Sequence, residues 1–139
     1  MAASPTGQAA AQPAPSPVVQ PLAVLVCALG GEGGGVLSEW LYDAAVLAGY
    51  PAQATSVPGV AQRTGATTYY IEVFPRLAAE LQGRRPIFSL NPVPGALDLL
   101  VSSELLETLR QVGNGMSSPQ RTQIISSVAR SLTVAEKMQ

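Results

Sequence analysis

The segment of the sequence best suited to chemistry is a glycine run that follows an apolar stretch. It reads LGGEGGG over residues 29–35. A glycine turn between a strand and a helix lets backbone N–H groups converge on an anion at the helix N-terminus. The candidate cofactor-binding or partner-facing residues are Gly30, Gly31, Gly33 and Gly34. Close packing of strand against helix needs glycines too, and the acidic Glu32 opposes a phosphate, so both interpretations stay open.

The glycine run does not match the common nucleotide-binding motifs. In a GxGxxG reading that begins at Gly31, Val36 occupies the third glycine position. The fingerprint also needs an acidic residue about 20 positions further on. Residues 51–54 read PAQA and supply none, and no Lys precedes a Ser or Thr as a P-loop requires. A nucleotide- or coenzyme A-binding α/β module without catalysis is therefore kept only as the alternative function.

A second candidate is the polar loop made of Gln62, Arg63, Thr64 and Gly65. Arginine presents a planar fork of donors that suits a carboxylate, and glycine lets another backbone approach. The loop lies between two expected strands, so a rigid scaffold would hold it. It is predicted either to face a cofactor or partner or to be a solvated loop tip.

Two other charged groups are interpreted as solvent-exposed. Arg84 and Arg85 read as a solvated turn. Glu104, Glu107 and Arg110 recur at three-residue steps, which an exposed helix with an internal ion pair explains.

The composition excludes several classes of chemistry. Of the 139 residues 12% are charged, against about 25% in ordinary domains. The net charge of -1 offers no polycation for nucleic acid. There is no His, and Cys27 is the single cysteine, which excludes a His base, an internal disulfide, a zinc site and an iron–sulfur cluster. Cys27 is expected to be a packed core residue in a reducing, cytoplasmic compartment.

Alternating strands and helices must position these residues. The sequence predicts an α/β fold, a three-layer α/β/α arrangement with a largely parallel or mixed central sheet. Expected strands cover residues 22–28, 51–57, 66–74, 87–90, 97–101, 122–126 and 132–134. Helices are expected after the glycine run to residue 48 and over 102–112, with one or two helical turns over 76–82. The first helix carries an apolar stripe formed by Val36, Leu37, Trp40, Leu41, Ala44, Ala45 and Ala48.

Residues 1–20 form a separate compositional segment. They carry no charge and are rich in Pro, Ala, Ser and Gln, which predicts a disordered leader. Residues 21–139 are predicted to be a single α/β domain. No run approaches the ~18 apolar residues of a membrane span, so no membrane partner is expected.

Three motifs in order resemble a known family. The family's GxGGQG turn corresponds to residues 28–33, with Ala28 and Glu32 as departures. Its AQRxG loop corresponds to residues 61–65, and its strand followed by a Glu-containing helix corresponds to residues 96–110. Residues 22–137 thereby resemble the small (beta) subunit of indolepyruvate:ferredoxin oxidoreductase. More broadly, they are similar to the gamma domain of the 2-oxoacid (pyruvate/ketoisovalerate-type):ferredoxin oxidoreductases.

The resemblance implies a subunit that acts in oxidative decarboxylation of an aryl 2-oxoacid, such as indolepyruvate, to an acyl-coenzyme A. Thiamine diphosphate, iron–sulfur clusters and coenzyme A would belong to a catalytic partner, with ferredoxin as electron acceptor. This chain would hold no catalytic residue and no cofactor alone, and Arg63 would face the partner. The branch often continues in longer forms, so truncation at the C-terminal end is left open. A homo-oligomer that forms through apolar surface is the remaining alternative.

Overall fold

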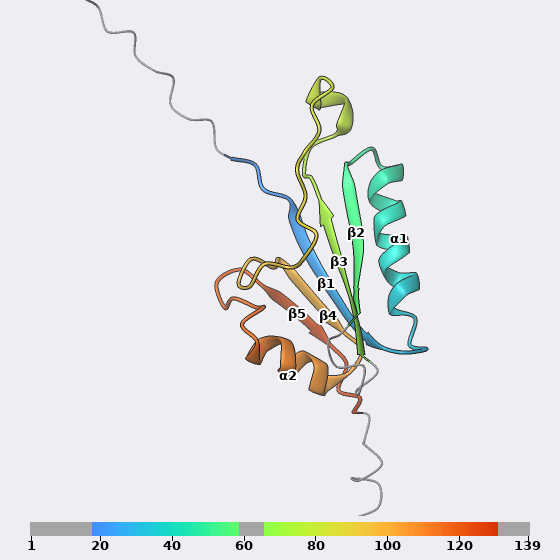
Figure 1. The fold of residues 1–139 in the computed structure, drawn as a ribbon, viewed down its shortest axis with the longest axis vertical. Coiled ribbons are helices and arrows are strands. Elements are labelled where there is room, and N and C mark those ends of the chain that lie inside the picture. Colours follow the sequence, from blue (N-terminus) through green and yellow to red (C-terminus); the bar gives the residue numbers. More distant parts are fainter. Residues whose placement is uncertain (1–17, 59–65, 131–139) are drawn as a thin grey trace, which may run out of the picture.

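The computed structural model describes residues 18–58 and 66–130, and Figure 1 shows their arrangement. The expected leader up to residue 17 and the expected strand at 132–134 lie outside the described residues. The elements in chain order are β1 (Leu22–Leu29), α1 (Gly34–Leu47), β2 (Ala52–Pro58), β3 (Ala66–Val73), the 3-10 helix η1 (Ala78–Leu81), β4 (Leu99–Ser102), α2 (Leu105–Gly113) and β5 (Gln123–Ser126). The predicted α/β fold class is confirmed.

The strands form one mixed sheet in the order β2-β3-β1-β4-β5. β1 runs parallel to β4, and β4 runs parallel to β5. β3 is antiparallel to both of its neighbours, β1 and β2. The apolar run of residues 23–28 is buried along its whole length because β1 is the middle strand.

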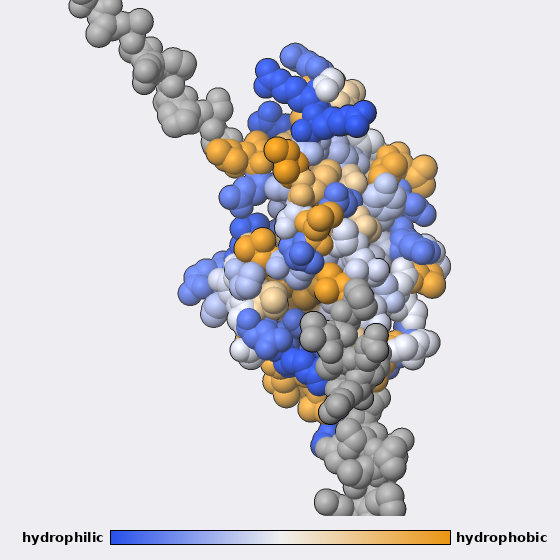
Figure 2. Space-filling model, in the orientation of Figure 1, coloured by the Kyte–Doolittle hydropathy of each residue, from blue (hydrophilic) through white to orange (hydrophobic). Residues whose placement is uncertain are grey.

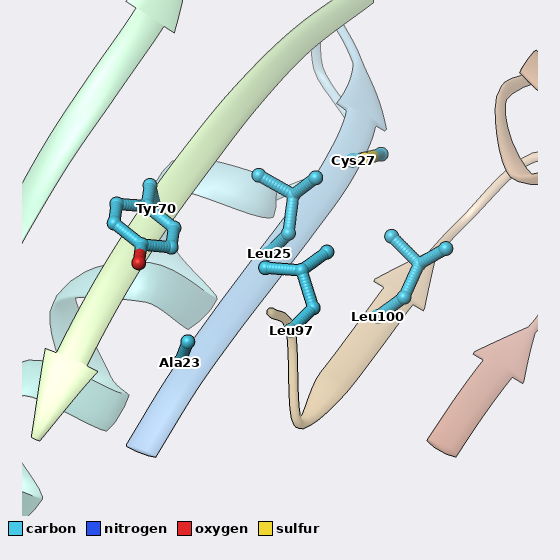
Figure 3. Close-up of a cluster of buried hydrophobic side chains, with 6 residues drawn as sticks. All are labelled: Ala23, Leu25, Cys27, Tyr70, Leu97 and Leu100. Atoms are coloured by element: carbon cyan, nitrogen blue, oxygen red, sulfur yellow. The ribbon is translucent and has the colours of Figure 1, made fainter. Parts of the chain in front are cut away.

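The two faces of the sheet bury different clusters. Side chains alternate along a strand, so Ala23, Leu25 and Cys27 share one face with Tyr70 and Leu100, as Figure 3 shows. Val24, Val26 and Ile71 form the cluster on the other face.

Each face carries one helix. Thr108 of α2 shares a hydrogen bond with Ser126. Ser126 pairs with Ser102, and Ser102 pairs with Cys27, so α2 covers the face of the sheet that carries Cys27. Gly34 of α1 packs on the opposite face, against Ala28 and Tyr69. The helices therefore complete the three predicted layers.

The predicted strand at 87–90 is wrong. Side chains of the neighbouring strands bind this backbone instead of a strand ladder. Gln53 Nε2 donates to the Ser89 carbonyl at 3.0 Å, and Thr55 Oγ1 donates to the Leu90 carbonyl at 3.0 Å. The Ser89 N–H donates to Glu72 Oε2 at 2.7 Å. Prolines at 86, 92 and 94 remove backbone donors around the segment, which disfavours strand pairing.

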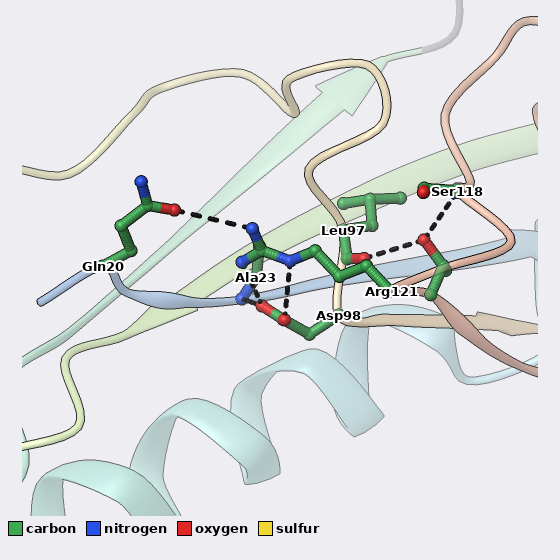
Figure 4. Close-up of polar contacts among 7 residues, drawn as sticks. Gln20, Ala23, Leu97, Asp98, Ser118 and Arg121 are labelled. Carbon is green, nitrogen blue, oxygen red and sulfur yellow. Dashed lines mark hydrogen bonds and ion pairs between the residues drawn. The ribbon is translucent and has the colours of Figure 1, made fainter.

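One carboxylate joins the starts of three strands (Figure 4). Asp98 Oδ2 accepts from the Ala23 backbone N–H at 2.8 Å. The same side chain accepts from Arg121 Nε at 2.8 Å and from Arg121 Nη2 at 3.1 Å. Ala23 lies in β1, Asp98 immediately precedes β4, and Arg121 lies two residues before β5. This network fixes the relative positions of the strands at the end of the sheet opposite the glycine run.

Helix α1 presents its apolar stripe to solvent. An amphipathic helix ordinarily buries such a stripe. Here the buried residues of α1 are Gly34 and Ser38, whereas in the stripe Trp40 is 68% exposed and Val36 is 48% exposed. Small side chains bring the helix close to the sheet, and the large ones point away from it.

Candidate functional site

The glycine run lies at the end of the central strand, between an antiparallel and a parallel neighbour. It follows the carboxyl end of β1, which has the antiparallel β3 on one side and the parallel β4 on the other. In open α/β sheets this kind of position commonly forms a ligand crevice. Gly31 and Gly33 have φ of 84° and 79°, which side-chain-bearing residues rarely adopt, and Gly33 is the N-cap of α1. The local backbone thus has the form of an anion-binding turn.

Gly34 serves close packing. A Cβ at this position would lie 2.5 Å from the Ala28 Cβ and 3.1 Å from Tyr69 Cε2. A Cβ at Gly30, Gly31 or Gly33 would have nothing within 4 Å. Of the four predicted glycines, Gly34 supports the packing interpretation, while the other three line an open turn.

Glu32 supplies the carboxylate of this turn. Its Oε2 accepts from the Leu29 backbone N–H at 2.9 Å and from the Ser103 hydroxyl group. Ser103 precedes α2, so Glu32 links the connection after β1 to the connection after β4. A fixed negative charge at the turn opposes a second anion, as the sequence predicts.

The pocket beside the turn is small. Its volume is about 140 Å³, and its lining includes Ala28, Glu32, Gly34 and Ser103. Ligand pockets usually hold about 300–1,000 Å³. The turn is therefore poorly suited to a nucleotide or coenzyme A, and at Gly34 its arrangement favours strand–helix packing.

Gln62, Arg63, Thr64 and Gly65 lie outside the described residues. The described strand ends that flank them belong to β2 and β3, and Ala66 pairs with Leu29. The end of β2 and the start of β3 therefore lie at the same end of the sheet as the glycine run.

Cys27 is a core residue, as the sequence predicts. Its side chain is fully buried. Burial, and secondarily the negative charge of Glu107, raises the pKa of the Cys27 thiol to about 12. Because the thiolate is the reactive form, this cysteine is not a candidate nucleophile.

We expect the Cys27 thiol to resist alkylation in the folded chain. At pH 8 iodoacetamide should modify it at least about tenfold more slowly than in the urea-unfolded chain, because burial suppresses both access and the thiolate. Mass spectrometry of timed samples measures this rate. Equal rates in the two states would contradict the assignment of Cys27 to the core.

The expectation of an exposed acidic face on the second helix is wrong. Glu104 and Glu107 are each 3% exposed. Glu104 is the N-cap of α2, and its Oε2 accepts from the Glu107 backbone N–H at 2.8 Å. Glu107 pairs with Arg110 at 2.6 Å, as the predicted ion pair requires. The capping role places Glu104 against the sheet, and the next turn brings Glu107 toward Cys27, so the acidic face packs inward.

The residues of this chain do not fit a metal cluster. Within residues 18–58 and 66–130 no three His, Cys, Asp or Glu side chains gather so that they could hold a metal ion. The whole sequence contains one Cys and no His, whereas iron–sulfur clusters need several thiolate or imidazole ligands. Among the described helices none is long and apolar enough to cross a membrane.

A protein-family model matches most of the chain. The family model described as "Pyruvate ferredoxin/flavodoxin oxidoreductase" matches residues 23–130. Among the curated proteins, none matches this sequence.

Two solved structures share the fold. One is 2-oxoglutarate:ferredoxin oxidoreductase from Magnetococcus marinus, with a TM-score of 0.59 and 11% identity over 82% of this chain. The other is the PORC subunit of pyruvate oxidoreductase from Thermotoga maritima, with a TM-score of 0.53 and 17% identity over 81% of this chain. This chain spans 18% of the length of the first and 53% of the length of the second.

Proposed function

Because the chain belongs to the pyruvate ferredoxin/flavodoxin oxidoreductase family, we propose that it is a non-catalytic subunit or domain of a 2-oxoacid:ferredoxin oxidoreductase. It packs against a catalytic partner that carries thiamine diphosphate and iron–sulfur clusters and that passes electrons to ferredoxin. The sequence supports this division of labour, since one buried Cys and no His leave this chain without ligands for such clusters. In this proposal the chain provides a surface that packs against the catalytic partner, and the cofactors of the partner carry out the chemistry.

The observation that carries the proposal is the exposed apolar face of α1. Val36, Leu37, Trp40, Leu41 and Leu47 are between 37% and 87% exposed. Figure 2 shows hydrophobic residues at the surface on the side of the molecule that α1 occupies. Monomeric soluble proteins rarely leave a large contiguous apolar patch uncovered. We assign this face, made of Val36, Leu37, Trp40, Leu41 and Leu47, to the contact with the catalytic partner.

The proposed substrate is an aryl 2-oxoacid of the indolepyruvate type, converted to its acyl-coenzyme A. This part rests on the resemblance of residues 22–137 to the small subunit of indolepyruvate:ferredoxin oxidoreductase. Arg63 is proposed to contact the partner near its active site. The alternative, a nucleotide- or coenzyme A-binding module, is disfavoured by the carboxylate of Glu32 in the glycine turn.

We expect Trp40→Ser to weaken assembly with the catalytic partner at least about tenfold. Buried aromatic anchors commonly dominate the affinity of an interface. The free chain should keep its melting temperature, because Trp40 is mostly exposed in it. Co-purification with the thiamine-dependent subunit measures assembly, and 2-oxoacid-dependent reduction of ferredoxin, assayed with indolepyruvate, pyruvate and 2-oxoglutarate, measures function.

Leu109→Ser is the matched control, because Leu109 is 58% exposed on the other helix. It should leave both assembly and activity unchanged. Turnover by the isolated chain, or full activity of the partner without it, would overturn the proposed function. Normal assembly of the Trp40 variant would overturn only the assignment of the α1 face.

A further inference from the structure

A second pocket lies at the opposite end of the sheet from the glycine run. Its volume is about 530 Å³, and it is bounded by the last turn of α1, the start of β2, the helix η1 and residues 84–88. Figure 1 shows the end of α1, the start of β2 and η1 at one end of the molecule. This volume lies within the range usual for small-molecule sites. We propose that the pocket binds a small organic anion with an apolar body and a carboxylate group.

Apolar side chains supply a surface for the body of such a ligand. Val46, Ala52, Leu81 and Phe88 line the pocket, together with Tyr50. These residues come from α1, β2, η1 and the segment after η1, so the fold as a whole forms the walls. Aromatic and aliphatic walls with a few charged groups are the usual composition of a ligand site.

Two arginines supply the charge. Arg84 and Arg85 both line the pocket and are exposed. The ion pairs found in the described part of the chain involve Arg110 and Arg121, and neither Arg84 nor Arg85 has a carboxylate partner there. Two guanidinium groups beside an apolar wall are complementary to a carboxylate on an apolar body.

The backbone before the arginines has a costly conformation. Gln82 has φ 52° and ψ 41°, and it is the one non-glycine residue with positive φ in the described ranges. Gly83 follows with φ 81°, and the Arg84 N–H donates to the Leu81 carbonyl at 2.9 Å. Non-glycine residues in left-handed conformations cluster at ligand sites and tight turns. This turn directs the chain from η1 back along the pocket and places both arginines at its lining.

The test uses the full chain and 2-naphthoate as the probe. Titration followed by two-dimensional NMR should shift the signals of Val46, Ala52, Ala78 and Leu81, and the shifts give a Kd. The double variant Arg84→Gln/Arg85→Gln should raise this Kd at least about tenfold, because it removes the charged donors that a carboxylate would bind. The neutral analogue 2-naphthamide should bind the native chain more weakly than 2-naphthoate, by a similar factor.

Two control variants locate the effect. Arg76→Gln removes an exposed arginine that does not line the pocket, and Trp40→Ser alters the apolar face of α1. Both should bind 2-naphthoate with the native Kd. The proposal is overturned if 2-naphthoate and 2-naphthamide bind equally, if the arginine pair can be removed without effect, or if no pocket signal shifts. The proposed assembly with a catalytic partner involves other residues, so it can hold or fail independently of these results.

Discussion

Replacing Gly34 with Ala is expected to lower the free energy of unfolding by about 1–3 kcal/mol, the usual range for overpacking a tight interior site. The added methyl group would lie 2.5 Å from the Ala28 Cβ, well inside van der Waals contact, and 3.1 Å from the ring of Tyr69. Both neighbours belong to the central part of the sheet and have little freedom to withdraw. Urea unfolding, monitored by circular dichroism, measures the loss.

A second substitution identifies the cause. Ala28→Gly removes the methyl group that the new side chain meets, so Ala28→Gly/Gly34→Ala should lose less stability than the two single variants together. We expect a coupling energy of about 1 kcal/mol or more, as is found for residues in direct contact. Gly113→Ala is the control, because a Cβ at the end of α2 would have no atom within 4 Å. Strict additivity of the pair would show that the contact between β1 and α1 is not the cause.

The sequence predicted the strands most reliably where local composition and tertiary environment agree. The apolar run of residues 22–28 predicted a strand buried on both faces, and β1 occupies the middle of the sheet. The β-branched and aromatic residues of 66–74 likewise predicted β3. Residues 87–90 have a similar local composition, but their backbone partners are the side chains of Gln53, Thr55 and Glu72. Because those partners are distant in the sequence, the composition of residues 87–90 gives no sign of them.

Helix α1 shows why a periodic pattern can identify a helix without identifying its buried side. The large apolar residues form a stripe, but Gly34 and Ser38 form a second one at four-residue spacing, and that narrow stripe is buried. Small residues at this spacing indicate a close approach of the helix to the sheet, and here they mark the buried side of α1. Which stripe is buried depends on how near the sheet lies to the helix axis, and tertiary packing determines that distance.

The candidate site was predictable in part. That Glu32 opposes an anion at the glycine turn follows from its charge and its place among glycines, and its hydrogen bonds to Leu29 and Ser103 hold the carboxylate in that turn. The pocket beside Arg84 and Arg85 was not predicted, because its walls come from four segments between residues 46 and 88. A basic pair in a turn looks the same in sequence whether it faces solvent or a pocket.

Asp98→Asn is expected to lower the free energy of unfolding at pH 7 by about 1.5–3 kcal/mol, the usual contribution of hydrogen bonds to a charged group. The amide keeps the shape of the side chain but loses the charge that Arg121 contacts. One of its two oxygen acceptors is also replaced by a donor. A carbonyl oxygen in the place of Oδ2 can still accept from the Ala23 N–H and Arg121 Nη2, but the amide NH2 then faces Arg121 Nε and loses that hydrogen bond. Asp43→Asn, at an exposed position on α1, is the control and should change the unfolding free energy by less than about 0.5 kcal/mol.

The effect of Asp98 should depend on pH in a defined direction. Burial by itself raises the pKa of the Asp98 carboxyl, but the hydrogen bonds from Arg121 and the Ala23 backbone and the charge of Arg121 outweigh it, so the folded pKa lies below the usual value. A carboxyl with a lowered folded pKa binds fewer protons in the folded than in the unfolded chain. Its stabilisation is therefore fully present above the unfolded pKa of about 3.9 and is lost as pH falls through the folded pKa.

Unfolding free energies of the native chain and of Asp98→Asn, measured in urea from pH 7 to pH 2, test this directly. The difference between them should stay constant down to about pH 5, where an unperturbed carboxyl begins to take up protons, and then shrink as the pH falls further. Arg121→Gln should also flatten the acid dependence, because it removes the main cause of the lowered pKa. A difference that persists unchanged at pH 2 would show that the contribution of Asp98 comes from shape and neutral hydrogen bonding. The negative charge of Asp98 would then not be needed to stabilise the junction of β1, β4 and β5.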